Sequence, residues 1–250
     1  SRAAVQRHVR LRMTPARGRN LSVRDLEVRG EGGRPILSVA RLQVAAGSAV
    51  AVRGPSGAGK TTLLYALAGL VPPTAGRILW DDEDIAGLGE RARAAFRCRT
   101  MGFVFQEHLL FEELSAPGNA SLAALYSAAE HRGAIRARAA EQLSRLGLDG
   151  SAARRSDSYS GGERQRIAVA RALAADPDVI LADEPTASLD RANADQLADD
   201  LVALARAEGR TLIAVSHDPA LHERADRVLD IADGRLAADT AMPVPGAAHA

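Results

Sequence analysis

The chain has 250 residues, of which 46% are hydrophobic, so its length allows one large domain or two modest domains with a substantial core. Its 32 basic and 31 acidic residues nearly cancel, and this balance gives no reason to expect nucleic-acid binding. The sequence has no apolar stretch long enough to cross a bilayer and no hydrophobic run of a signal peptide, and its single cysteine, Cys98, excludes an internal disulfide. We therefore expect a soluble protein, or one held at a membrane only by partners.

The first segment of the chain is strongly basic. We expect residues 1–20 to be a disordered basic tail, with a membrane-surface contact as the less favoured alternative. The folded domain is then expected at 21–236, and the tail at 237–250, rich in Ala and Pro, is expected to be disordered. The arginines of the first segment are Arg2, Arg7, Arg10, Arg12, Arg17 and Arg19.

The folded part opens with two predicted strands. Leu21–Val28 and Ile36–Val44 alternate apolar and polar residues, as half-buried strands do. Glycines between them, Gly30, Gly32 and Gly33, predict a hairpin-like turn.

A phosphate-binding loop follows a short apolar strand at 49–52. Residues 54–61 read Gly-Pro-Ser-Gly-Ala-Gly-Lys-Thr and match the pattern G-x-x-x-x-G-K-[ST] without a mismatch. Successive backbone N–H groups of such a loop form a nest for phosphate oxygens, and the helix expected at 62–68 points its positive end at them. A glycine-rich turn that merely precedes a lysine is the alternative, but strand, loop and helix stand in the required order. The candidate nucleotide-binding residues are Gly54, Pro55, Ser56, Gly57, Ala58, Gly59, Lys60, Thr61 and Thr62.

The middle of the chain changes character. Strands are expected at 77–80 and at 102–105, where the second ends at Gln106. The Ala-, Leu- and Arg-rich stretches 120–129 and 135–146 have helical spacing and predict a helical subdomain at about 107–160.

In the second half, predicted helices alternate with apolar strands. Helices are expected at 162–175, 191–207 and 219–225, and strands at 179–182, 211–215 and 228–231. This alternation favours right-handed crossovers and a mainly parallel sheet.

Two carboxylates, Asp183 and Glu184, end the most apolar of these strands. Such a pair is usually a solvated strand end. After a complete phosphate-binding loop, however, Asp183 can support a Mg²⁺ shell and Glu184 can polarise a water for in-line attack on a terminal phosphate.

A second anion site is predicted at Ser160-Gly161-Gly162-Glu163, where two glycines and a capping serine open a helix. One chain with one ATP does not need two such sites, but two chains facing head to tail do. A plain capped helix is the alternative.

At this point the sequence resembles the ATP-binding cassette (ABC) family of transport ATPases, whose signature reads Leu-Ser-Gly-Gly-Gln. The chain has Tyr159-Ser160-Gly161-Gly162-Glu163 and departs at the first and last positions. Phe105-Gln106 resembles the family's Q-loop, Ser188-Leu189-Asp190 its D-loop and Ser216-His217-Asp218 its H-loop. Stretches around these motifs are most similar to the lipoprotein-release and macrolide-export branch of the family.

The resemblance implies an α/β fold, a P-loop NTPase of ABC type with a mainly parallel core sheet, an antiparallel β edge and a helical subdomain. It implies an ATPase that energises a separate transmembrane permease through an ATP-sandwich homodimer, at the inner face of the cell membrane. A soluble ABC ATPase of repair or translation is the alternative. ATP and Mg²⁺ are the implied cofactors. The implied roles are catalysis for Glu184, His217 and Lys60, metal binding for Thr61, Gln106 and Asp183, and nucleotide contacts for Gln106, Ser160, Gly161, Gly162, Glu163 and Asp190.

One family feature is missing. An aromatic ring that stacks on adenine is expected near Gly30, yet no aromatic residue occurs between Ser1 and Tyr65. We expect weak selectivity between ATP and GTP, with Arg29 as a partial substitute that lays its planar guanidinium on the base.

Overall fold

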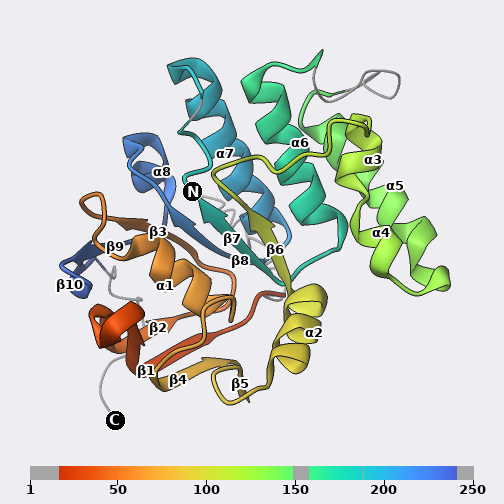
Figure 1. Ribbon diagram of the computed structural model, residues 1–250. Helices are drawn as coiled ribbons and strands as arrows, with labels where there is room; N and C mark the ends of the chain where they lie inside the picture. Colours follow the sequence, from red (N-terminus) through yellow and green to blue (C-terminus); the bar gives the residue numbers. More distant parts are fainter. Residues whose placement is uncertain (1–16, 149–157, 188, 241–250) are drawn as a thin grey trace, which may run out of the picture.

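The computed structural model describes residues 17–148, 158–187 and 189–240. In this part of the chain, ten strands form one sheet in the order β5-β4-β1-β2-β10-β9-β3-β8-β7-β6 (Figure 1). The strands are β1 (Leu21–Arg29), β2 (Pro35–Val44), β3 (Ala49–Arg53), β4 (Ala75–Trp80), β5 (Glu83–Asp84), β6 (Met101–Val104), β7 (Val179–Asp183), β8 (Thr211–Val215), β9 (Arg227–Ala232) and β10 (Arg235–Asp239). The helices are η1 (Glu31–Gly33), α1 (Lys60–Leu67), α2 (Glu90–Thr100), α3 (Ala116–Ala120), α4 (Ala123–Tyr126), α5 (Ala129–Arg145), α6 (Gly161–Ala174), α7 (Arg191–Ala207) and α8 (Pro219–Arg224).

The parallel half of the sheet lies between the two hydrophobic clusters of the core. Strands β6, β7, β8, β3 and β9 pair in parallel, and every residue of β7 and β8 is buried. Successive side chains of a strand point to opposite faces. Val179 and Leu181 therefore join the hydrophobic cluster around α1 and β1, whereas Ile180 and Ala182 join the one around α5, α6 and α7.

The antiparallel edge is the other half. Strand β1 pairs antiparallel with β2 and β4, and β4 pairs with β5. Figure 1 shows these strands at one end of the molecule and helices α3, α4 and α5, packed against α6, at the other. The predicted mainly parallel sheet, antiparallel β edge and helical subdomain are confirmed.

Within the helical subdomain, the helix expected at 120–129 is wrong as a single element. The chain instead forms two short helices, α3 and α4, because Ser115 caps an early start at Ala116 and the buried Asn119 side chain binds the backbone of Phe111 and Leu114. The helix expected at 135–146 begins earlier, at Ala129.

The ordered domain is wider than expected at both ends. Arg17 forms an ion pair with Asp176 at 2.7 Å and Arg19 one with Asp178 at 3.1 Å, so the chain packs on the domain before the boundary predicted at residue 20. At the other end, β10 reaches Asp239, and the Thr240 N–H donates to the carbonyl of Val228. The remaining parts of the two expected tails, 1–16 and 241–250, lie outside the described residues.

Capping residues place several helix starts beside the carboxyl ends of the parallel strands. Asp190 caps α7 through the Asn193 N–H, and Asp218 caps α8, whose first residue is Pro219.

No helix in the described ranges combines the length and apolar content that crossing a membrane requires.

Candidate functional site

The phosphate-binding loop joins β3 to α1. Gly54 adopts a φ of +152°, and a Cβ there would lie 1.9 Å from the carbonyl oxygen of Ile231, so only glycine fits. Helix α1 begins at Lys60, two residues before the predicted start, which places the Lys60 and Thr61 side chains at the mouth of the loop.

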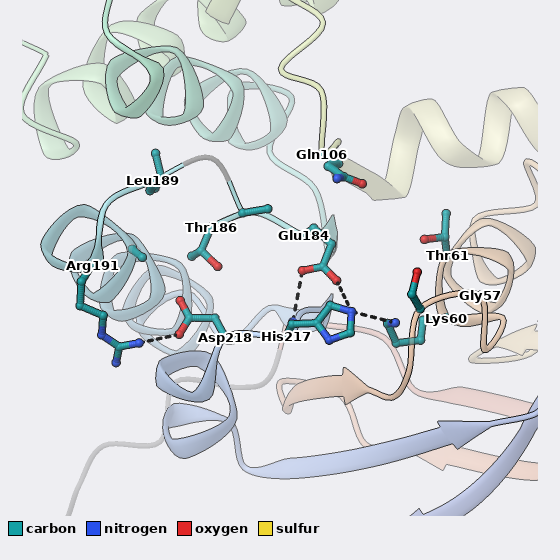
Figure 2. Close-up of a pocket in the computed structure, with 13 residues that line it drawn as sticks. Gly57, Lys60, Thr61, Gln106, Glu184, Thr186, Leu189, Arg191, His217 and Asp218 are labelled. Atoms are coloured by element: carbon teal, nitrogen blue, oxygen red, sulfur yellow. Dashed lines mark hydrogen bonds and ion pairs between the residues drawn. The ribbon is translucent and has the colours of Figure 1, made fainter.

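The Lys60 ammonium connects the loop to β8. Its Nζ lies 2.9 Å from the carbonyl oxygens of Gly54 and Pro55 and 3.1 Å from Nε2 of His217 (Figure 2). The structure thus brings together two residues predicted to be catalytic.

Thr61 and Asp183 meet where helix α1 begins and strand β7 ends. The Thr61 hydroxyl donates to a carboxylate oxygen of Asp183 at 3.1 Å. Burial raises the pKa of the Asp183 carboxyl, the hydrogen bond from Thr61 opposes the rise, and the charge of Glu184 adds to it. A buried carboxylate next to a like charge is stabilised by a cation, which fits the metal-binding role predicted for Asp183.

Tyr65 was not predicted from the sequence. It lies one helical turn after Thr61, and burial together with the charge of Asp183 raises the pKa of its hydroxyl, which is hydrogen-bonded to that carboxylate. The i, i+4 spacing from Thr61 was the signal that could have found it.

Glu184 follows β7 in a strained backbone conformation. Its φ is +45°, in the left-handed region, and its N–H donates to the Val215 carbonyl at 2.8 Å. One carboxylate oxygen accepts from the His217 N–H at 3.2 Å, and the other lies 3.4 Å from His217 Nε2. The side chain is 14% exposed, so the strained turn aims a nearly buried carboxylate into the cavity.

A cavity of about 710 Å³ unites Lys60, Thr61, Glu184 and His217. Figure 2 shows Glu184, His217, Lys60 and Thr61 around it, with Gln106 above. Two further residues, Arg191 and Asp218, line it and form an ion pair at 3.2 Å that the sequence did not reveal. The predicted residues Ser56, Gly57, Lys60, Thr61, Gln106, Glu184 and His217 all line this cavity.

The signature residues do not line this cavity. Ser160 and Glu163 form a reciprocal capping box: the Ser160 hydroxyl accepts from the Glu163 N–H, and a Glu163 carboxylate oxygen accepts from the Ser160 N–H. The Asp190 carboxylate is likewise occupied as the cap of α7, with Asn193 as its donor, and these hydrogen bonds lower the pKa of Asp190. Ser188 of the predicted D-loop lies outside the described residues.

A second cavity, of about 620 Å³, adjoins the phosphate-binding loop on its other side, and Gly30, Arg34 and Ile36 line it. Arg29 does not. Its guanidinium pairs with Glu27 at 3.1 Å, a position that does not favour the predicted contact of Arg29 with the base. The register of β1 and β2 shifts between Val28 and Arg29, and such a bulge re-aims a side chain.

The donor set for a metal is small. No cluster of three or more His, Cys, Asp or Glu side chains capable of holding a metal occurs among the described residues. Thr61, Asp183 and Tyr65 do, however, line a small cavity together with Gln106. Glu107 lines it as well. The Asp183 carboxylate with the oxygens of Thr61 and Gln106 fits Mg²⁺, which usually takes its remaining ligands from phosphates and water.

Comparisons with known proteins agree with this geometry. Residues 37–187 match the family model described as ABC transporter. The macrolide export ATP-binding/permease protein MacB 1/2 of Paracoccus denitrificans is 44% identical over 218 residues, which are 87% of this chain and 32% of that protein. The lipoprotein-releasing system ATP-binding protein LolD is 42% identical in Chromohalobacter salexigens, covering 82% of this chain and 86% of that protein. LolD of Ruegeria pomeroyi is 44% identical, covering 80% and 87%.

The chain thus spans about a third of its MacB relative and most of its LolD relatives, and both belong to the predicted branch.

Solved structures share the fold. The cassette MJ0796, a dimer bound to ADP and Pi, has a TM-score of 0.78 and 31% identity, covering 88% of this chain and 97% of that chain. The cbiO1 protein of Clostridium perfringens, part of the transporter complex cbiONQ, has a TM-score of 0.79 and 29% identity, covering 88% and 87%. These similarities confirm the predicted fold class.

Proposed function

Since this chain belongs to the ABC transporter family and is an ATP-hydrolysing cassette, we propose that the cavity between the phosphate-binding loop and β8 holds the triphosphate. The observation that carries this proposal is the convergence of three side chains from separate elements: His217 lies 3.1 Å from Lys60 and 3.4 Å from Glu184. The loop amides and the Lys60 ammonium bind the phosphate oxygens.

The proposed chemistry divides among the side chains of the cavity. Thr61, Asp183 and Gln106 hold Mg²⁺, which neutralises phosphate charge when bound. Glu184 accepts a hydrogen bond from the attacking water and orients it for in-line displacement of the terminal phosphate. His217 lies beside both Lys60 and Glu184, where its ring can form a hydrogen bond with a phosphate oxygen.

Removal of the Lys60 charge tests the site. The Lys60→Ala chain is expected to lose about 100-fold to 1,000-fold in ATP turnover, since one preorganised donor to the developing phosphate charge is worth that much. Phosphate release with Mg-ATP measures it. Arg41→Ala, which removes an exposed cation from β2, is the matched control and should hydrolyse ATP at the wild-type rate. Equal rates for the two variants would contradict the proposed phosphate site.

The transport partner is proposed to dock on a groove between the sheet edge and the helical subdomain. This groove, of about 650 Å³, has a largely apolar floor that includes Met101, Phe103 and Ile135. Tyr126 on its rim is 88% exposed, and the neighbouring Leu125 is 61% exposed. Exposed apolar side chains gathered at one groove mark a protein interaction site.

The charge of the groove points to the chemistry of the partner. Arg99, His131, Arg138 and Arg171 line it, and no Asp or Glu is among the described residues that do so. Arg138 and Arg171 donate to backbone carbonyl oxygens rather than to carboxylates. An amphipathic helix with acidic residues, from the cytoplasmic side of a permease subunit, complements this surface. The proposed location is therefore the cytoplasm at the inner face of the membrane. The LolD and MacB relatives favour a transporter subunit over a soluble repair or translation ATPase.

The single cysteine makes the groove directly testable. Cys98 lines the groove and is exposed, so a photo-crosslinker on its thiol is expected to capture an integral membrane protein in native membranes. The control chain carries Cys98→Ser and Leu70→Cys, which moves the thiol to an exposed apolar position outside the groove. Mass spectrometry identifies the adducts. Equal capture from both positions, or capture of soluble proteins only, would contradict docking at the groove.

A further inference from the structure

The second cavity beside the phosphate-binding loop is built by three turns. The loop supplies Pro55–Ala58, the hairpin between β1 and β2 supplies Gly30–Ile36 apart from its two central glycines, and the hairpin between β9 and β10 supplies Asp233 and Gly234. Close backbone packing holds the turns together. The Gly234 N–H donates to the Ala58 carbonyl at 3.0 Å, and a Cβ on Gly234 would lie 2.3 Å from the Ile36 carbonyl oxygen.

The cavity continues the triphosphate site. Ser56 and Gly57 line both cavities, so a nucleotide with its terminal phosphates at Lys60 extends along the loop into the second one. Its volume of about 620 Å³ is of the size that small-molecule sites have, which leaves room for a ribose and a purine.

The side chains in this cavity differ from those of an aromatic base site. No aromatic residue is among the described residues that line it. The planar side chain it offers is the guanidinium of Arg34, which is exposed at the hairpin, and the largest of its apolar side chains is Ile36, 39% exposed. Glu31 adds a carboxylate at the same hairpin.

We propose that Arg34 stacks its guanidinium on the purine, with Ile36 packing alongside, and that the protein consequently takes ATP and GTP with similar affinity. This inference rests on the proposed triphosphate site. Arginine stacks on any π face, and every purine has one, so stacking does not read the exocyclic groups. The Glu31 carboxylate can accept from the amine of adenine or from N1–H and the amine of guanine, so it does not exclude either base.

Equilibrium binding tests the inference without relying on turnover. Isothermal titration calorimetry with ATP, GTP and inorganic triphosphate separates the contribution of the base from that of the phosphates. The wild-type affinities for ATP and GTP are expected to agree within about tenfold. Arg34→Ala should weaken both nucleotides by about tenfold, the size of a lost stacking contact, and leave inorganic triphosphate binding unchanged.

The hairpin itself supplies a matched control and a rescue. Arg29→Ala removes a guanidinium that pairs with Glu27 outside the cavity, and it should bind both nucleotides like the wild type. Gly30→Tyr in the Arg34→Ala background should restore affinity through a ring. Gly30 has φ −87° and ψ −168°, which any residue adopts, and its new Cβ would meet only the flexible end of Ile36 at 2.8 Å.

The outcomes separate the two proposals. If Lys60→Ala binds inorganic triphosphate with the affinity of the wild type, the proposed triphosphate site is overturned and, with it, this inference. Unchanged ATP affinity in Arg34→Ala, or a wild-type preference for ATP above about tenfold, would overturn the role of Arg34 while leaving the triphosphate site standing.

Discussion

The Glu184→Gln chain is expected to bind ATP like the wild type and to turn it over about two to four orders of magnitude more slowly. Glutamine keeps the shape of the side chain, and its carbonyl oxygen can still accept from the His217 N–H, the contact that the carboxylate makes at 3.2 Å. The amide cannot take up a proton or polarise a water as a carboxylate does. The position of the group is therefore preserved and its basicity is lost.

Single-turnover hydrolysis at saturating Mg-ATP measures the chemical step directly, and nucleotide affinity is measured on the same preparation. Glu83→Gln is the matched control, because it removes a carboxylate from the opposite edge strand, where it lies 3.7 Å from Arg99. That variant should retain the wild-type rate. A Glu184→Gln chain that hydrolyses its bound ATP at nearly the wild-type rate would remove Glu184 from the role of general base.

The parts of this site that the sequence predicted are those built by local rules. The spacing of Gly54, Lys60 and Thr61 defines a loop whose geometry depends on its own backbone, and Asp183 ends an apolar strand whose central place follows from its composition. Parallel strands bring such ends to one edge of the sheet, so the meeting of Thr61 with Asp183 could be expected from the sequence alone.

The parts that the sequence did not predict depend on contacts between distant segments. Arg29 and Arg34 are equivalent as residue types, but Arg29 follows a bulge at the end of β1 and pairs with Glu27, whereas Arg34 lies in the turn and lines the cavity. Arg17 is ordered because Asp176, far along the chain, lies next to it, and this pairing lowers the pKa of Asp176 to about 2. Local composition contains neither fact.

The second large effect is expected from assembly: Mg-ATP should convert the Glu184→Gln chain from monomer to a stable homodimer, and the wild type to a transient one. Helix α6 presents the N–H groups of Gly161 and Gly162 at its positive end, and these residues do not line the triphosphate cavity of their own chain. Nothing within the described residues requires a glycine at 162. Its φ is not positive, and a Cβ there would make only ordinary contacts of 3.6 Å or more. We expect a close approach by the nucleotide of a second chain to be the reason for the missing side chain.

Light scattering with and without Mg-ATP measures the mass, which should double for Glu184→Gln. Adding Ser160→Arg to that chain should keep it monomeric, because a long cation at the helix start blocks the approach of the second chain, while ATP affinity of the monomer stays unchanged. In the wild-type background the same substitution should reduce turnover to the rate of Glu184→Gln. Ser144→Arg, on the exposed face of α5, adds the same charge outside the signature and should leave both dimer and turnover intact. A signature that completes the site of a partner chain could not tolerate an arginine at its centre. If the Ser160→Arg chain dimerises and hydrolyses ATP like the control, the signature therefore does not complete that site.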